Sequence, residues 1–227
     1  MLNRRSFIVG SSLLFTPTVG AFAQTGKPKY TGKLVISPKQ DGRLMQLQQP
    51  FSYIDAKGTD WAVPSGAIVD GASIPRIFWS IIGGPWEGAY VQASVVHDWF
   101  CAVRTMPWQQ THQMFYEAML TSGVSSAKAK IMFLAVRYAG PSWDDLTLEN
   151  SRILSDNGRK RLDPPLMKNS SNGFASEDEA EKAKKALTAQ FAELRNQVEQ
   201  GNLAIGQIED LVDKTGRAED VANMLES

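Results

Sequence analysis

The stretch VPSGAIVDGASIPR at residues 63–76 and the stretch GAYVQASVVHDWFCAV at residues 88–103 indicate the fold class of this 227-residue chain. The first stretch places turn residues around the short apolar run 67–69, a pattern typical of a strand that ends in a tight loop. The second stretch is apolar on every side except at His97 and Asp98, which predicts a helix buried in a core. Strand and helix signals stand next to each other, and we predict an α+β fold.

Four further apolar runs lie upstream, in pairs that are separated by turn residues such as Asp41-Gly42. They are residues 34–36, 44–47, 51–54 and 61–64. Strand, turn and strand in this order predict β-hairpins. We therefore expect a small antiparallel β-sheet over about residues 33–70.

Two more helices are expected after the buried one. The first covers residues 108–120 and follows Pro107, and the second covers residues 126–138 with Ser125 as its cap. Together with the buried helix they make a three-helix unit at about residues 74–138. The sheet is expected to pack on this unit.

The carboxy-terminal quarter has a different composition. Residues 146–175 are rich in Pro, Asp, Asn and Ser, which predicts a loop or linker. Ser176 and Glu179 then form a capping box that begins an amphipathic helical tail over residues 176–227. Its apolar stripe consists of Leu187, Phe191, Leu194 and Val198. The tail is expected either to fold back on its own domain or to mediate self-association or the binding of a protein partner.

Charge and the amino terminus bear on the location of the protein and its partners. The 24 Lys and Arg side chains balance 24 Asp and Glu side chains, so we expect no nucleic-acid partner. Arg4-Arg5, an apolar run and Ala21-Phe22-Ala23 resemble a twin-arginine export signal over residues 1–23, with a Sec signal as the alternative. Residues 24–32 are then expected to be a linker. We expect a periplasmic or secreted protein with no stable membrane anchor.

The two histidines of the chain, His97 and His112, fall on consecutive predicted helices. Antiparallel packing of these helices can bring them together. Cys101 follows His97 by four residues and shares its face of the helix. The side chain of Asp98 leaves the same helix about 100° away from that of His97.

Three interpretations of this group stay open. In the first, His97 is a general base that activates water, and Asp98 supplies an oxygen to a cation or to the substrate. In the second, His97, Cys101 and His112, with or without Asp98, bind a transition metal such as zinc. In the third, these polar groups only satisfy hydrogen bonds in the core. The candidate catalytic residues are His97, Asp98, His112 and Asp70, the last of which can alternatively cap a turn.

Three neighbouring residues are candidates for substrate binding. Arg76 and Arg104 can clamp an anionic group, although a single arginine more often pairs with an acidic side chain. Trp99 can line an aromatic cleft, or it can simply pack in the core.

A longer series of residues resembles the DUF1353 family, small domains of unknown function found in bacteria, phages and prophages. The series is Val63-Pro64, Gly66, Asp70-Gly71-Ala72-Ser73-Ile74-Pro75-Arg76, Trp79, Gly83, Gly88, Ala93, Val96-His97-Asp98, Arg104, Phe115, Ala118-Met119, Gly123-Val124 and Ala135-Val136-Arg137. We expect a DUF1353-like domain at residues 33–145. Cys101 stands where the family usually has Tyr, and His112 stands where it usually has Asp, a change that suggests a site adapted to a metal.

The helix pair is also similar, more distantly, to that of phospholipase A2. This resemblance implies His97 as the base, Asp98 as a calcium ligand and His112 in the place of the orienting Asp. Ester or lipid hydrolysis is therefore the leading enzymatic hypothesis, with calcium or zinc as the possible divalent metal. The alternative is a non-catalytic periplasmic or phage-derived module in which His97 and Asp98 are structural.

Overall fold

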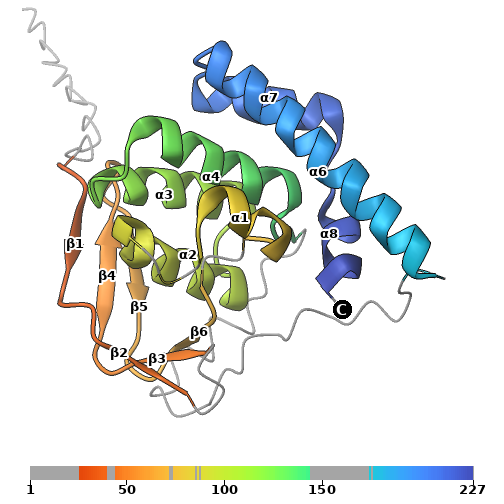
Figure 1. Ribbon diagram of the computed structural model, residues 1–227. Helices are drawn as coiled ribbons and strands as arrows, with labels where there is room; N and C mark the ends of the chain where they lie inside the picture. The colour runs from red at the N-terminus through yellow and green to blue at the C-terminus, as the bar shows by residue number, and fades with distance from the viewer. Residues whose placement is uncertain are drawn as a thin grey trace, which may run out of the picture.

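A computed structural model of the chain describes residues 26–39, 44–71, 74–84, 86, 88–143, 174 and 176–226. Strands lie on one side of a central group of helices, and three carboxy-terminal helices lie on the other side (Figure 1). The expected export signal at residues 1–23 and nearly all of the expected loop at 146–175 fall outside the described residues.

The strands form two three-stranded antiparallel sheets, where a single sheet was predicted. The first sheet has the order β1 (Lys29–Thr31), β4 (Phe51–Ile54) and β5 (Asp60–Val63). The second has the order β2 (Ile36–Pro38), β3 (Met45–Leu47) and β6 (Ile68–Val69). Both predicted hairpins form, as β2 with β3 and as β4 with β5. The α+β class is confirmed.

Strand β1 lies inside residues 24–32, which the sequence predicted as a linker. Tyr30 explains this difference, because its side chain contacts residues that are far away in the sequence. Its ring stacks on Phe51 at a centroid distance of 5.4 Å, and its hydroxyl donates to the carbonyl oxygen of Ala118 at 2.8 Å. The strand is therefore held by the core and by a helix.

The central helices follow the prediction closely. They are the 3-10 turn η1 (Arg76–Phe78), α1 (Trp79–Ile82), the 3-10 turn η2 (Gly88–Tyr90), α2 (Val91–Val103), α3 (Trp108–Thr121) and α4 (Ser126–Ala139). Ser125 caps α4 by accepting a hydrogen bond from the main-chain nitrogen of Lys128. Helix α2 is buried along most of its length, as its sequence indicates, and packs against α3 and both sheets.

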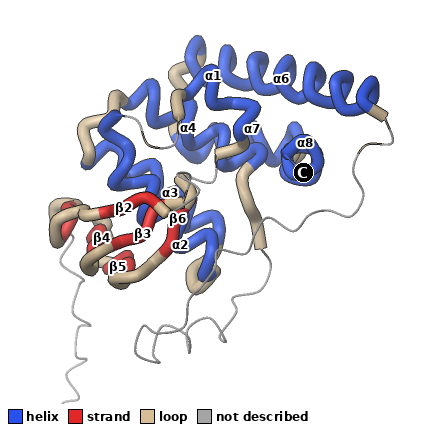
Figure 2. The backbone as a smooth tube through the Cα atoms, turned by 60° about the horizontal axis from the view of Figure 1, so that its bottom comes forward, coloured by secondary structure: helices blue, strands red, loops and turns tan. Residues whose placement is uncertain are grey.

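The carboxy-terminal helices are α6 (Glu177–Gln200), α7 (Ile205–Thr215) and α8 (Glu219–Glu226). They cover the side of α4 that faces away from the strands (Figure 2). The ring of Phe191 stacks on that of Phe78 at 4.1 Å, and the Tyr138 hydroxyl donates to Gln190 at 2.6 Å. The apolar stripe of the tail is therefore buried against its own domain, which is the first of the two interpretations.

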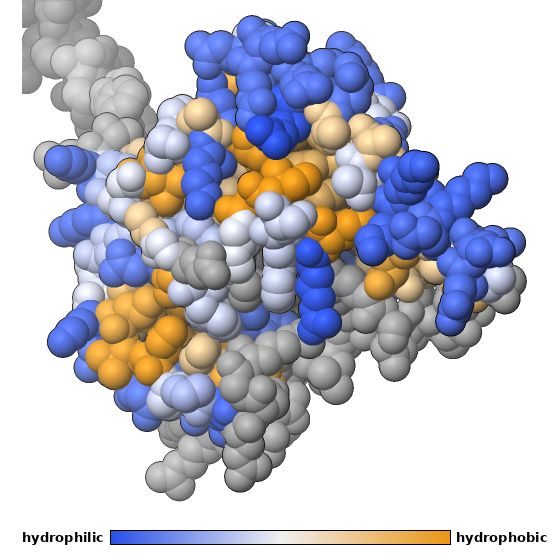
Figure 3. Space-filling view, viewed as in Figure 1, coloured by the Kyte–Doolittle hydropathy of each residue, from blue (hydrophilic) through white to orange (hydrophobic). Residues whose placement is uncertain are grey.

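Apolar side chains remain partly visible where α1 meets α6 (Figure 3). Ile77 on η1 and Ile81 on α1 are only partly buried. Among the helices described, none combines the length and hydropathy that crossing a membrane requires.

Candidate functional site

The centre of the candidate site is a pair of histidine side chains between α2 and α3. His97 Nε2 lies 2.8 Å from His112 Nδ1, and both side chains are fully buried. The antiparallel packing of two apolar helices, joined by a short turn at Met106-Pro107, produces this contact. The structure thus brings together the two histidines that the sequence placed on consecutive helices.

The partners of the histidines fix the direction of their hydrogen bonds. His112 Nε2 lies 3.1 Å from the carbonyl oxygen of Pro141, and a carbonyl can only accept. His112 Nε2 therefore carries the proton, and in the neutral ring its Nδ1 is an acceptor. It follows that His97 donates from Nε2 to His112 Nδ1.

The ring of His112 is suited to a neutral state. Burial, the neighbouring His97 and the positive charge of Arg217 hold the pKa of His112 well below its usual value of 6.5. A neutral imidazole can bind a metal or accept a proton, whereas an imidazolium can do neither.

Cys101 completes a group of three potential metal ligands. Its Sγ lies 3.6 Å from His97 Nε2 and 3.8 Å from His97 Nδ1, one helical turn along α2. The side chain of Cys101, the single cysteine of the chain, is buried. One ligand atom from each of His97, Cys101 and His112 lies within 4.8 Å of the other two.

Asp98 contacts the loop that precedes the central helices. Its Oδ2 accepts hydrogen bonds from the main-chain nitrogens of Asp70, at 2.6 Å, and Gly71, at 3.0 Å. Gly71 has φ +97°, a left-handed conformation that favours glycine. Asp98 thus ties the Asp70-Gly71 loop to the buried helix, and Asp70 contributes its main chain to this contact.

The three candidate substrate-binding residues lie at separate places. Arg76 is exposed on η1, with its guanidinium 5.8 Å from the ring centre of Trp79. Arg104 ends α2 in a left-handed conformation with φ +55°, and its guanidinium lies 5.7 Å from the ring centre of Trp143. Trp99 is buried in the core, 3% exposed.

Three groups around His112 were not among the predicted site residues. The carbonyl of Pro141 is the hydrogen-bond acceptor of His112. The Trp108 ring is steeply inclined to the His112 ring, with a centroid distance of 5.5 Å. The guanidinium of Arg217 lies 4.3 Å from the ring centre of Trp108. Trp108 was visible one turn before His112 on the same predicted helix, but no sequence signal links residues 141 or 217 to it.

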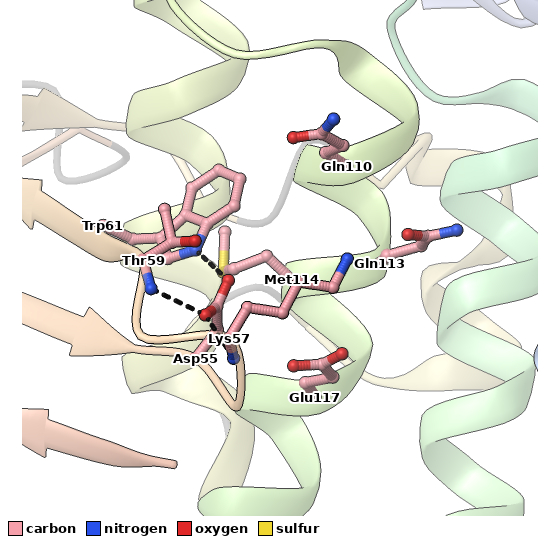
Figure 4. A pocket seen from close by; sticks show the side chains of 8 residues that line it. All are labelled: Asp55, Lys57, Thr59, Trp61, Gln110, Gln113, Met114 and Glu117. Atoms are coloured by element: carbon pink, nitrogen blue, oxygen red, sulfur yellow. Dashed lines mark hydrogen bonds between the residues drawn. The ribbon is translucent and has the colours of Figure 1, made fainter. Parts of the chain in front are cut away.

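A small polar pocket lies on another part of the domain (Figure 4), with a volume of about 40 Å³. Asp55 accepts hydrogen bonds there from the main-chain nitrogens of Lys57 and Thr59 and from Trp61 Nε1. These contacts close the β4–β5 turn. The volume suits about one water molecule.

Comparison with known proteins gives a match to a family model and no activity. Residues 45–136 match the family model described as protein of unknown function (DUF1353). The uncharacterized protein y4jT of Sinorhizobium fredii is 52% identical over 110 residues, which are 48% of this chain and 32% of that protein. The uncharacterized protein y4iH of the same organism is 38% identical over 125 residues, 54% of this chain and 52% of that protein.

The matched part of the chain therefore spans about a third of the length of y4jT and about half of the length of y4iH. No solved structure matches the chain significantly. The match includes the Asp70–Arg76 loop, the His97-Asp98 pair, Cys101 and His112. The resemblance expected from these motifs is confirmed over residues 45–136, the matched stretch that we refer to as the DUF1353 segment.

Proposed function

We propose that His97, Cys101 and His112 form a centre for a divalent transition metal of the zinc type, and that this centre carries the function of the DUF1353 segment. The observation behind the proposal is the convergence of two imidazoles and one thiol within 4.8 Å in a buried part of the core. Nitrogen and sulfur are the ligand atoms that zinc prefers.

The ligand distances support this choice. With the usual zinc–ligand bond lengths, a tetrahedral site separates two nitrogens by about 3.3 Å and a nitrogen from a sulfur by about 3.6 Å. The Cys101 Sγ–His97 Nε2 distance is 3.6 Å, and the His97 Nε2–His112 Nδ1 distance is 2.8 Å. The two histidines would separate by about half an ångström and give up their hydrogen bond, on the geometry of such sites.

The protons of the site are compatible with metal binding. His112 Nδ1 already presents a lone pair, because the Pro141 carbonyl holds the proton on Nε2. His97 would move its proton from Nε2 to Nδ1, and Cys101 would lose its thiol proton. Binding of one metal ion would therefore release one proton.

The geometry favours zinc over calcium. Calcium takes oxygen ligands, and the group of three offers none. Asp98, the expected calcium ligand, instead accepts two N–H groups at Oδ2. The proposed centre leaves Asp98 out and assigns it to the loop.

A non-catalytic module is the interpretation that burial favours, because His97 and His112 are fully buried and Cys101 is 6% exposed. Hydrolysis of an ester or lipid is the second candidate. It rests on the number of ligands, because three protein ligands and an open fourth position are typical of catalytic zinc sites.

Metal analysis of the purified protein, followed by titration with Zn²⁺ and Co²⁺, tests the centre. We expect one equivalent per chain in the wild type, and none in Cys101→Ala or His112→Ala. Ser94→Ala is the matched control, since Ser94 is a fully buried polar residue of the same helix α2. A wild type that binds neither ion would refute the centre.

An activity panel separates the two candidate functions. Loss of ester or lipid hydrolysis in His97→Ala, with activity retained in Ser94→Ala, would establish the hydrolase. Metal binding without hydrolysis would leave the non-catalytic module.

Export remains part of the proposal and rests on Arg4-Arg5 and the apolar run that follows them. Mass spectrometry of the periplasmic protein would reveal cleavage after Ala23. Export that survives Arg4→Lys with Arg5→Lys would point to the Sec route.

A further inference from the structure

We infer that the carboxy-terminal appendage, formed by α6, α7 and α8, completes the candidate site. Arg217 and Glu219 are the positioning residues that hold the Pro141 carbonyl against His112. The metal readout of this inference rests on the proposed centre. Both residues lie outside the DUF1353 segment, which ends at residue 136.

Arg217 binds the end of α4. Its guanidinium donates to the carbonyl oxygens of Arg137 and Gly140. These carbonyls belong to the end of the helix, where main-chain acceptors lack partners within the helix and where positive charge is favourable. The main-chain nitrogen of Ala218 adds a bond to the carbonyl of Tyr138 at 2.8 Å.

Glu219 binds the residue on the other side of Pro141. Its Oε1 accepts from the main-chain nitrogen of Ser142 at 3.0 Å, and its Oε2 accepts from the Ser142 hydroxyl at 2.5 Å. Arg217 and Glu219 also form an ion pair at 3.2 Å. Gly140 and Ser142 are thus both held by the same turn of the appendage.

Pro141 lies between these two anchored residues. It has no main-chain N–H, so hydrogen bonds of its neighbours must fix its orientation. Its carbonyl accepts the bond from His112 Nε2 at 3.1 Å. The turn at residues 217–219 therefore determines where this acceptor lies.

A second contact connects Arg217 to the same histidine. Its guanidinium lies 4.3 Å from the ring centre of Trp108, and the centre of that ring lies 5.5 Å from the ring centre of His112. Arg217 thus supports both the hydrogen-bond acceptor and the aromatic neighbour of His112. Partners of this kind, which orient a metal-binding histidine, commonly change metal affinity by about 10–100-fold when they are lost.

The test uses the full chain with three variants, Arg217→Gln, Arg217→Lys and Glu219→Gln. Arg217→Lys retains the charge and loses the fork that reaches two carbonyls. Arg195→Gln is the matched control, because Arg195 forms an exposed ion pair with Glu199 on α6. Circular dichroism selects the variants that fold. If Arg217→Gln does not fold, either Arg217→Lys or Glu219→Gln is sufficient to test the positioning roles.

Two readouts are measured. Long-range ¹⁵N–¹H NMR of the metal-free protein reports the tautomer of each imidazole. The spectrum is simple to assign because the sequence has two histidines. Co²⁺ titration reports affinity and the absorption spectrum of the centre. We expect the folded variants to lose the Nε2–H tautomer preference of His112 and to bind Co²⁺ about 10–100-fold more weakly, with Arg195→Gln unchanged.

The outcomes separate the two proposals. A variant with wild-type imidazole signals and wild-type Co²⁺ affinity would overturn the positioning roles and leave the metal centre standing. A wild type that binds no Co²⁺, with His112 signals that change in the variants, would overturn the metal centre and support the positioning roles.

Discussion

The carboxylate of Asp98 lies 2.6 Å from the main-chain nitrogen of Asp70 and accepts its hydrogen bond. The two members of the His97-Asp98 pair thus contact different parts of the domain. Asp98 holds a loop on the sheet side of α2, while His97 contacts a second helix.

Asp98→Ala is expected to lower the free energy of unfolding by about 1.5–3 kcal/mol, because it removes the charged acceptor of two main-chain N–H groups. Urea unfolding measures the change. Ser94→Ala, in which a buried hydroxyl without a hydrogen-bond partner is removed, should be neutral or stabilising. Equal stability of the two variants would show that Asp98 does not hold the loop.

Phe191→Ala is expected to lower the free energy of unfolding by about 3–5 kcal/mol, because the ring is fully buried between the tail and η1. Limited proteolysis should then cut within α6 sooner than in the wild type. Leu120→Ala is the control, since Leu120 is 39% exposed, and its effect should stay within about 0.5 kcal/mol. Unchanged protease resistance of Phe191→Ala would contradict the docking of the tail.

Asp55 should make the stability of the domain depend on acidic pH. Burial alone would raise the pKa of Asp55, but hydrogen bonds from Trp61, Thr59 and Lys57 outweigh it and lower the pKa below 3.8. The unfolded chain therefore binds the proton more readily. The stabilisation is complete above about pH 4 and disappears as the pH falls through the folded pKa.

Unfolding free energies between pH 2 and pH 6, compared for the wild type and Asp55→Asn, measure this contribution. The difference should shrink as the solution becomes more acidic. Asp60→Asn, an exposed carboxylate on the neighbouring strand β5, is the control. A difference that is independent of pH would disprove the assignment.

The thiol of Cys101 should react with a disulfide reagent at least ~100-fold more slowly in the native protein than in urea, because access requires local opening of the core. The chain has one cysteine, so the absorbance change reports this site alone. Zn²⁺ should slow the reaction further if the proposed centre forms. Rapid reaction of the native thiol would show that the site is open.

Local signals in the sequence predicted much of the fold. Ser125 and Ser176 begin helices as expected, because a cap needs only its own residue and a main-chain N–H three positions away. The buried helix around His97 was visible from its composition. The two histidines met because consecutive helices joined by a short turn pack side by side.

Long-range contacts explain what the sequence did not predict. The strand at Tyr30 depends on Ala118, 88 residues away, and the division into two sheets depends on which strands pair. Pro141 lies between the last predicted central helix and the predicted linker at 146–175, and Arg217 lies in the predicted helical tail. Neither residue has a local pattern that links it to His112.

The hydrogen bonds from His97 through His112 to Pro141 all point one way, with each proton directed toward the carboxy-terminal turn. The row of dipoles therefore has an electron-rich end on α2, beside Cys101. An end of this sign attracts a cation or the proton of a thiol and repels an anion. The orientation of one carbonyl, held by the appendage, thus determines the polarity of the buried centre.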